Sequence, residues 1–119
     1  MIRVNKTMLS GIFVSDPVQG STHGGTAVAN FRLAHQLTKD KTCFIDCAVF
    51  GAQAECVMQY CMKGSIVLVE ARLEEDTWTD DSGNKRFKHY LTCNYVHFVN
   101  SPADNQKQNN TAKPIPNDF

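Results

Sequence analysis

Two phenylalanines and a carboxylate share one face of a predicted strand, "TCFIDCAVFG" at residues 42–51. Alternate side chains of a strand point to opposite faces of its sheet. The odd-numbered positions of this segment carry cysteine, isoleucine and valine, so they predict a core face. Phe44, Asp46 and Phe50 therefore point away from the core. Rings in such a position are either covered by a second layer or free to bind a flat ligand.

The cysteines are the residues with which a metal site would be built. There are five, an odd number, so they cannot all pair within one molecule. A structural zinc site needs two close pairs of ligands, whereas the chain has C-x3-C and C-x4-C spacings without a matching pair. We therefore expect free cysteines that pack as small apolar residues, with no metal and no cofactor.

Catalytic chemistry has little support in the sequence. The histidines, at positions 23, 35, 89 and 97, are scattered, and no Ser/His/Asp or paired-carboxylate arrangement is evident. Lone histidines on strands are usually structural or exposed to solvent. We therefore expect a binding protein and not an enzyme.

The formal charge is zero at pH 7, but it is unevenly distributed. Residues 70–81 contain six of the twelve acidic residues and one basic residue, so this segment carries −5 and the rest of the chain +5. Local patches, rather than the net charge, decide electrostatic binding. Overall neutrality therefore does not exclude an anionic ligand.

Length and hydropathy indicate one folded domain. A chain of 119 residues can bury a sizeable core but is too short for two domains. No apolar run approaches the length needed to cross a bilayer, and the N-terminus lacks a signal-peptide pattern. We therefore expect no membrane partner and a cytoplasmic location.

Five strands and one helix must position the aromatic residues. Alternation of polar and apolar residues predicts strands over 2–14, 26–37, 42–50, 65–78 and 86–99, and helical spacing predicts a helix over 52–64. The segment 15–25 reads as a loop, Gly11 as a bulge, and Leu73 as an inward residue. From Ser101 the chain is rich in Asn, Gln and Pro without periodicity, which predicts a folded domain over 1–100 and a disordered tail over 101–119.

This order of elements matches a known all-β architecture. Three strands, one short helix and two strands form the five-stranded OB barrel, whose open face binds oligonucleotides or oligosaccharides. A generic β-sandwich would lack the helix, and a βαβ fold would alternate helices with strands throughout. Trp78, the only tryptophan, falls on the outward face of its strand. With Phe44 and Phe50 it predicts a barrel surface on which nucleobases stack.

The loop length also predicts a register for the last hairpin. A turn at "DDSGN" places Asp76 opposite Lys88 and Trp78 opposite Arg86. Opposite charges in such pairs contribute roughly 0.2–1 kcal/mol. We therefore expect Asp76 to neutralise part of the charge of Lys88, and an arginine over the indole to add a cation–π attraction.

Several sequence blocks carry a family resemblance. In order they are "VNK", "SGIFVSDP", "GGTAVANFRLA", "FIDCAVFGAQAE", "QYCMKGSIVLVEARL" and "WTDDSGNKRF". They resemble the signature blocks of bacterial-type single-stranded DNA-binding proteins over residues 4 to about 99. The resemblance implies an OB fold, usually a homotetramer, that binds single-stranded DNA without sequence preference in replication, recombination and repair and has no catalytic activity.

The resemblance also assigns candidate site residues. Phe44, Phe50 and Trp78 match the main base-stacking positions of the family. Residues that match positions lining or supporting the DNA path are Tyr60, Lys6, Lys63 and Arg86. The expected DNA contacts are completed by the outward basic residues Arg32, Arg72 and Lys88.

Some positions depart from the family pattern. Asp46 stands where many members carry a basic or neutral polar residue, and Glu74 and Asp76 replace basic or polar residues. These acids leave open an alternative, an OB-fold accessory subunit of a replication-restart assembly that acts mainly through protein contacts. Oligo-dT binding would separate the two hypotheses.

The C-terminal tip is less acidic than is usual in the family. "PIPNDF" keeps Asp118 and ends in Phe119 but lacks the usual run of aspartates. Docking of replication and repair proteins through this tip is therefore an expectation that rests on two residues. The short tail and the altered surface suggest a phage, plasmid or secondary chromosomal version of a nucleoid-associated protein.

Overall fold

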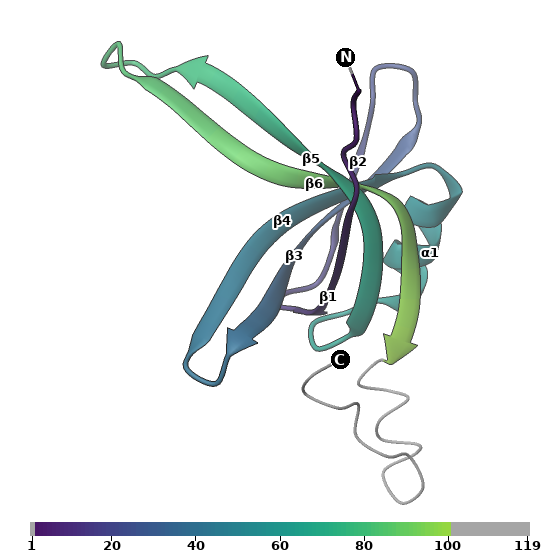
Figure 1. Ribbon diagram of the computed structural model, residues 1–119. Coiled ribbons are helices and arrows are strands. Elements are labelled where there is room, and N and C mark those ends of the chain that lie inside the picture. The colour runs from purple at the N-terminus through teal and green to yellow at the C-terminus, as the bar shows by residue number, and fades with distance from the viewer. Residues whose placement is uncertain (1, 101–119) are drawn as a thin grey trace, which may run out of the picture.

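The computed structural model describes residues 2–100, which form one barrel with a helix at its end (Figure 1). Its elements are β1 (Thr7–Phe13), β2 (Val18–Ser21), β3 (Ala27–Thr38), β4 (Lys41–Phe50), α1 (Ala52–Tyr60), β5 (Ile66–Thr79) and β6 (Lys85–Asn100).

The strands form one sheet that closes on itself. Their order is β1-β5-β6-β4-β3-β2, and a further pairing of β1 with β3 closes the ring. All pairings are antiparallel except that of β4 with β6, which is parallel. The predicted OB barrel is confirmed, with the helix between the third and fourth of the five predicted strands.

The core is made of the inward side chains of the predicted strands. They include Phe13, Phe31, Leu33, Val49, Val67, Val69, Val96 and Cys47. Helix α1 adds Ala54 and Val57 to the same cluster, and Cys61 follows directly after the helix, so these residues cover one end of the barrel. The rings of Phe13 and Phe31 stack with their centroids 4.7 Å apart.

Gly11 lies at the point where the barrel closes. A Cβ at this position would lie 3.0 Å from the carbonyl oxygen of Ala34 and 3.1 Å from Cβ of Leu33. Pairing of β1 with β5 continues through Gly11 without a shift in register, so the expected bulge is wrong. The glycine instead lets β1 approach β3, to which it pairs through Ile12 and Phe13.

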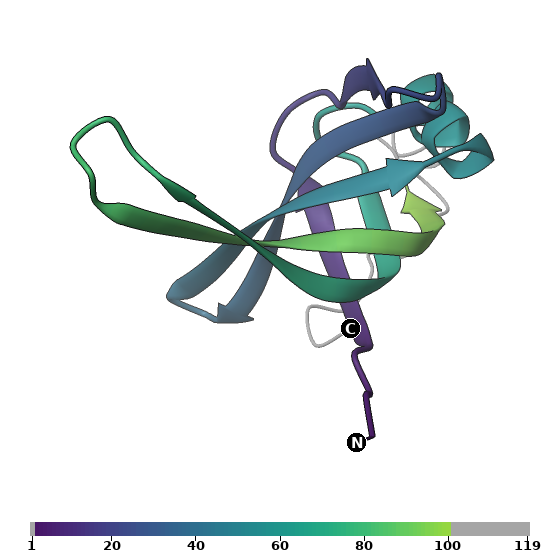
Figure 2. The same ribbon diagram turned by 90° about the horizontal axis from the view of Figure 1, so that it is seen from above.

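The hairpin β5–β6 extends well beyond the barrel wall (Figures 1 and 2). Ala71 is the last fully buried residue of β5, and Leu73 is exposed although its alternation predicted an inward side chain. The alternation continues past Ala71, but no opposite wall of the barrel remains to cover this face. The prediction for Leu73 is therefore wrong for a tertiary reason.

Other boundaries differ in smaller ways. The segment read as a loop contains the short strand β2, which pairs with the first half of β3. The first strand begins at Thr7 and not at residue 2. The predicted tail, with Asp118 and Phe119, lies outside the described residues.

All five cysteines are free, as predicted. Cys47, Cys61 and Cys93 are buried. A hydrogen bond with Cys93, together with burial, raises the pKa of Cys47, and burial raises the pKa of Cys61 to about 11. Cys47 and Cys61 therefore pack as neutral groups at neutral pH. Within residues 2–100 no group of three His, Cys, Asp or Glu side chains is arranged to hold a metal ion, and no helix is long and apolar enough to cross a membrane.

Candidate nucleic-acid interface

The outer side of β4 presents two exposed rings. Phe44 is 53% exposed and Phe50 is 43% exposed, while the alternate residues Cys47 and Val49 are buried in the core. No second layer covers these rings within the described part of the chain. Of the two alternatives that the sequence left open, the described structure therefore favours rings that are free to bind.

The third ring stands on the projecting hairpin. Trp78 is 48% exposed and lies opposite Arg86, and Asp76 lies opposite Lys88, so the predicted register is confirmed. Phe87, next to Arg86, points to the other side of the hairpin. We call the surface that carries the three rings the aromatic face, which comprises Arg32, Phe44, Asp46, Ala48, Phe50, Asp76, Trp78 and Lys88.

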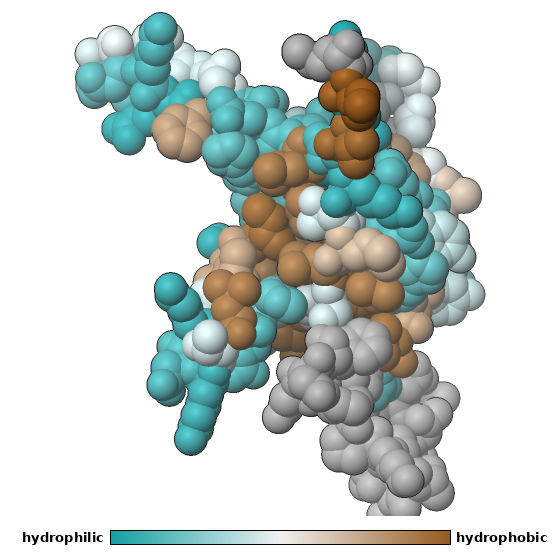
Figure 3. Space-filling view, viewed as in Figure 1, coloured by the Kyte–Doolittle hydropathy of each residue, from teal (hydrophilic) through white to brown (hydrophobic). Residues whose placement is uncertain are grey.

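The aromatic face is hollowed (Figure 3). In this view a recess separates the arm formed by β5 and β6 from the arm formed by β3 and β4. A hollow of about 270 Å³ lies between them and is lined by Asn30, Asp46, Cys47, Ala48, Asp76, Lys88 and Tyr90. A second hollow, of about 430 Å³, lies at the end of the hairpin beside Trp78, but most of its lining, with Glu75 and Phe87, belongs to the opposite side. The interface is therefore an open recess with rings at its borders.

The charges in the recess are paired differently from the prediction. The ammonium of Lys88 contacts the carboxylate of Asp46, at 2.6 Å, and not that of Asp76. The Tyr90 hydroxyl lies 3.4 Å from Asp76, and partial desolvation together with the charge of Asp76 raises the pKa of Tyr90. Pairing of β4 with β6 brings Asp46 to Lys88, and local hairpin register could not show this.

Arg86 does not lie over the indole. Its Nε donates to the carboxylate of Asp80, at 2.9 Å, and Asp80 also accepts from the backbone N–H groups of Ser82 and Asn84. The hydrogen bond from Arg86, with those from the turn, holds the pKa of Asp80 below its usual range. The cation–π contact of the described residues is instead Arg32 over Phe44, 5.5 Å from the ring centroid.

Three other residues that the sequence predicted as DNA contacts lie outside the aromatic face as defined above. Arg72 pairs with Glu74 at 3.2 Å on the outer side of β5. Tyr60 is the last residue of α1, and its ring centroid lies 6.3 Å from that of Phe98. The sequence analysis did not identify Phe98 as a neighbour of Tyr60. Lys63 is exposed in the turn that follows the helix.

Lys6 belongs to a different surface. Its ammonium lies 3.5 Å from Glu70, whose other oxygen is 2.6 Å from Nε2 of His97. The hydrogen bond with His97 and the charge of Lys6 hold the pKa of Glu70 below its usual range. The structure therefore does not bring Lys6 together with Asp46 and its partners.

Lys6 borders an apolar surface that the sequence reasoning did not identify. Outer side chains of β1, β5 and β6 align in three rows: Met8–Glu70–Tyr95, Ser10–Leu68–His97 and Ile12–Ile66. We call these residues the three-strand face; apolar side chains gather over β1 and β5 in Figure 3. The signal was present in the sequence, since Met8, Ile12 and Leu68 recur at even positions of their strands.

Comparison with known proteins gives a consistent result. The model of the single-strand binding protein family matches residues 4–99. A single-stranded DNA-binding protein of Wolinella succinogenes is 36% identical over 110 residues, which cover 86% of this chain and 68% of that protein. The Helicobacter hepaticus protein of the same name is 34% identical over 117 residues, which cover 90% and 69%. The Helicobacter pylori protein is 40% identical over 70 residues, which cover 59% and 39%.

Proposed function

The chain belongs to the single-strand binding protein family, and from this premise we propose that it binds single-stranded DNA without sequence preference. The observation that carries the proposal is the presence of three exposed rings, Phe44, Phe50 and Trp78, on one hollowed surface of an OB barrel. Every nucleobase has a flat apolar face, so stacking on such rings tolerates any sequence.

Stacking supplies much of the binding energy in this proposal. Each base on a ring contributes about 1–3 kcal/mol. Arg32, Arg86 and Lys88 lie beside the rings, on strands β3 and β6, and supply positive charge along the path of the backbone. Binding and protection of the strand, with no reaction on it, is the role that this arrangement fits. The expected settings are replication, recombination and repair in the cytoplasm.

Tryptophan fluorescence tests the function directly, because Trp78 is the only tryptophan in the chain. A base that stacks on the indole should quench its emission, so titration with oligo-dT should lower the fluorescence to a plateau. A double-stranded oligonucleotide of the same length is the control and should leave the emission nearly unchanged. A flat titration with oligo-dT would contradict the proposal and favour an accessory subunit that acts through protein contacts.

We also propose that the protein assembles as a homotetramer. The three-strand face exposes Met8, Ile12 and Tyr95, which a second copy would cover. In addition, β1 pairs with β3 only through Ile12 and Phe13, so one edge of its first half is unpaired within the described residues. A free strand edge beside an apolar face is a surface on which strands of another copy can pair. Symmetric closure of such contacts gives a tetramer with two-fold axes.

Two further roles rest on the family resemblance and, for Arg72, on its outward position on β5. Docking of replication and repair proteins would use the C-terminal tip with Asp118 and Phe119. Tyr60, Lys63 and Arg72 would extend the DNA path beyond the aromatic face. Deletion of residues 102–119 should then abolish partner binding and leave affinity for oligo-dT nearly intact, because the segment has no net charge.

A further inference from the structure

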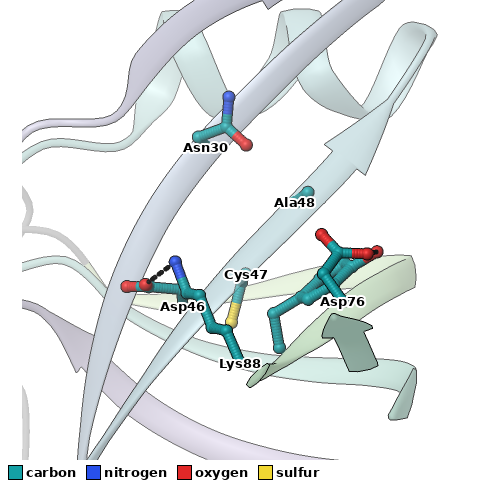
Figure 4. A pocket seen from close by; sticks show the side chains of 7 residues that line it. Asn30, Asp46, Cys47, Ala48, Asp76 and Lys88 are labelled. Atoms are coloured by element: carbon teal, nitrogen blue, oxygen red, sulfur yellow. Dashed lines mark hydrogen bonds and ion pairs between the residues drawn. The ribbon is translucent and has the colours of Figure 1, made fainter. Parts of the chain in front are cut away.

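The carboxylate of Asp46 lies between two cations that come from the strands on either side of β4. Nε of Arg32 on β3 is 3.8 Å from Oδ1, and Nζ of Lys88 on β6 is 2.6 Å from Oδ2. Each oxygen of the carboxylate therefore has its own cation. Figure 4 shows the Lys88 side chain directed to Asp46, while Asp76 lies on the other side of the hollow.

Arg32 also covers one of the stacking rings. Its guanidinium carbon is 5.5 Å from the centroid of Phe44, within the range of a cation–π contact. The pair with Asp46 and the contact with Phe44 hold the guanidinium over the ring. A base that stacks on the same side of Phe44 must displace Arg32 or stack on the guanidinium.

A carboxylate and a phosphodiester present the same chemistry to these cations. Each is an anion with two exposed oxygens that accept hydrogen bonds from arginine and lysine. DNA that runs past Phe44 offers its phosphates to cations that Asp46 already engages. The three charged groups together carry +1, whereas Arg32 and Lys88 alone would carry +2.

We propose that Asp46 occupies the place of a DNA phosphate in the free protein and competes with the DNA backbone for Arg32 and Lys88. This inference rests on the proposed function and concerns the affinity and salt dependence of that same site. DNA binding then exchanges two ion pairs within the protein for pairs with phosphate. Fewer net charges neutralise the DNA, so fewer counterions are released and the dependence of affinity on salt is shallow.

Replacement of Asp46 by asparagine tests the proposal, because it keeps the shape and removes the charge. Affinity for oligo-dT is measured at several salt concentrations by Trp78 fluorescence. Asp46→Asn should bind more tightly at low salt, and its slope of log affinity against log salt should steepen by about 0.7 for each additional phosphate that the protein neutralises on a single strand. Asp46→Asn raises the charge of the three groups from +1 to +2, so the expected steepening is about 0.7. Asp46→Ala should behave alike, since the charge and not the amide is responsible.

Glu75→Gln is the matched control. It changes the net charge by the same amount, but Glu75 pairs with His89 on the opposite side of the hairpin, at 2.7 Å. Its slope should equal that of the wild type. Equal steepening in both variants would show a general charge effect and overturn the proposal.

The remaining outcomes separate this inference from the proposed function. If wild type and Asp46→Asn bind oligo-dT with the same slope, the function stands and Asp46 does not compete with phosphate. Weaker binding by Asp46→Asn would show that the carboxylate positions the cations for DNA, which also overturns the proposal. If neither protein binds at low salt, the proposed function fails and this inference fails with it.

Discussion

The aromatic face and the three-strand face share β5, yet they expose apolar groups in different ways. On the aromatic face, Trp78 and the two phenylalanines are separated by charged side chains, and Asp46, Asp76 and Lys88 line the recess between them. On the three-strand face, Leu68 lies between Ser10 and His97, and the rows on each side bring Met8, Ile12 and Ile66 close to it. Isolated rings suit a ligand that arrives and leaves, whereas apolar side chains gathered over neighbouring strands suit lasting cover by protein.

The two surfaces also use their charges differently. In the proposed function, the acids of the aromatic face would lie where the DNA backbone approaches, and they would weaken a reversible contact. Glu70, on the three-strand face, is instead held by His97 of the same face and by Lys6 at its border. An ion network at such a border can fix the register of two copies without contributing much affinity. The comparison therefore predicts that assembly and DNA binding respond to different substitutions.

The largest expected effect comes from a charge placed on the three-strand face. In Leu68→Glu an unpaired carboxylate would be buried in the covered surface, at a cost of roughly 3–5 kcal/mol. We expect the wild type to have the mass of a tetramer in light scattering and the variant to dissociate. Thr77→Glu, on the exposed hairpin, is the control and should keep the wild-type mass.

Two results would break this half of the comparison. A monomeric wild type at micromolar concentration would contradict the tetramer itself. A tetrameric Leu68→Glu would show that assembly uses another surface.

Removal of a stacking ring should have an intermediate effect, on DNA binding alone. Trp78→Ala and Phe44→Ala should each weaken binding of oligo-dT by about 1–3 kcal/mol, roughly five- to 150-fold in Kd. Fluorescence anisotropy of a labelled oligonucleotide measures this in the absence of tryptophan. Neither substitution should change the mass of the assembly.

Phe87→Ala is the matched control for the hairpin. Phe87 is more exposed than Trp78 but points to the opposite side of the same hairpin. Its loss should leave the affinity for a short oligonucleotide within twofold of the wild type. An equal loss in Phe87→Ala would mean that exposure alone, and not the aromatic face, decides which rings bind DNA.

The sequence predicted which rings lie on the aromatic face better than it predicted how the charged side chains of this face pair. Strand alternation is local, so it located Phe44 and Phe50, and the turn length located the partner of Trp78. The partner of Lys88 could not be predicted, because Asp46 reaches it through a pairing between strands that are far apart in the sequence.

The other wrong or missing predictions have the same cause, because alternation within one strand does not show what lies against that strand. Leu73 follows a correct alternation into a part of the hairpin where the barrel no longer covers it. The strand β2 has four residues in a glycine-rich segment, too short for alternation to show. The three-strand face was readable on each strand, but only the register of β1 with β5 and of β5 with β6 combines Met8 and Leu68 into one surface.

The smallest expected effect is on the stability of the fold in acid. It compares Glu70, on the three-strand face, with Asp80, at the end of the hairpin that carries Trp78. The pKa values of Glu70 and Asp80 are both lowered, the first mainly by the hydrogen bond with His97 and the second mainly by that with Arg86. A carboxylate whose pKa is lower in the folded state stabilises the fold above its unfolded pKa, and this contribution is lost as the pH falls through the folded pKa. Both contributions should therefore be present at pH 7 and absent in strong acid.

Urea unfolding of Glu70→Gln and Asp80→Asn beside the wild type measures these contributions. At pH 7 both variants should unfold at lower urea than the wild type, and each difference should shrink as the pH falls through the lowered pKa of the replaced residue. The difference for Asp80→Asn should be the smaller, because its ion pair stays in water at the end of the hairpin, where exposed pairs contribute little. Once a second copy covers the three-strand face, water would screen the interactions of Glu70 with Lys6 and His97 less. A larger difference for Asp80→Asn than for Glu70→Gln would indicate that water still reaches Glu70 in the assembly, and that the three-strand face is not the covered one.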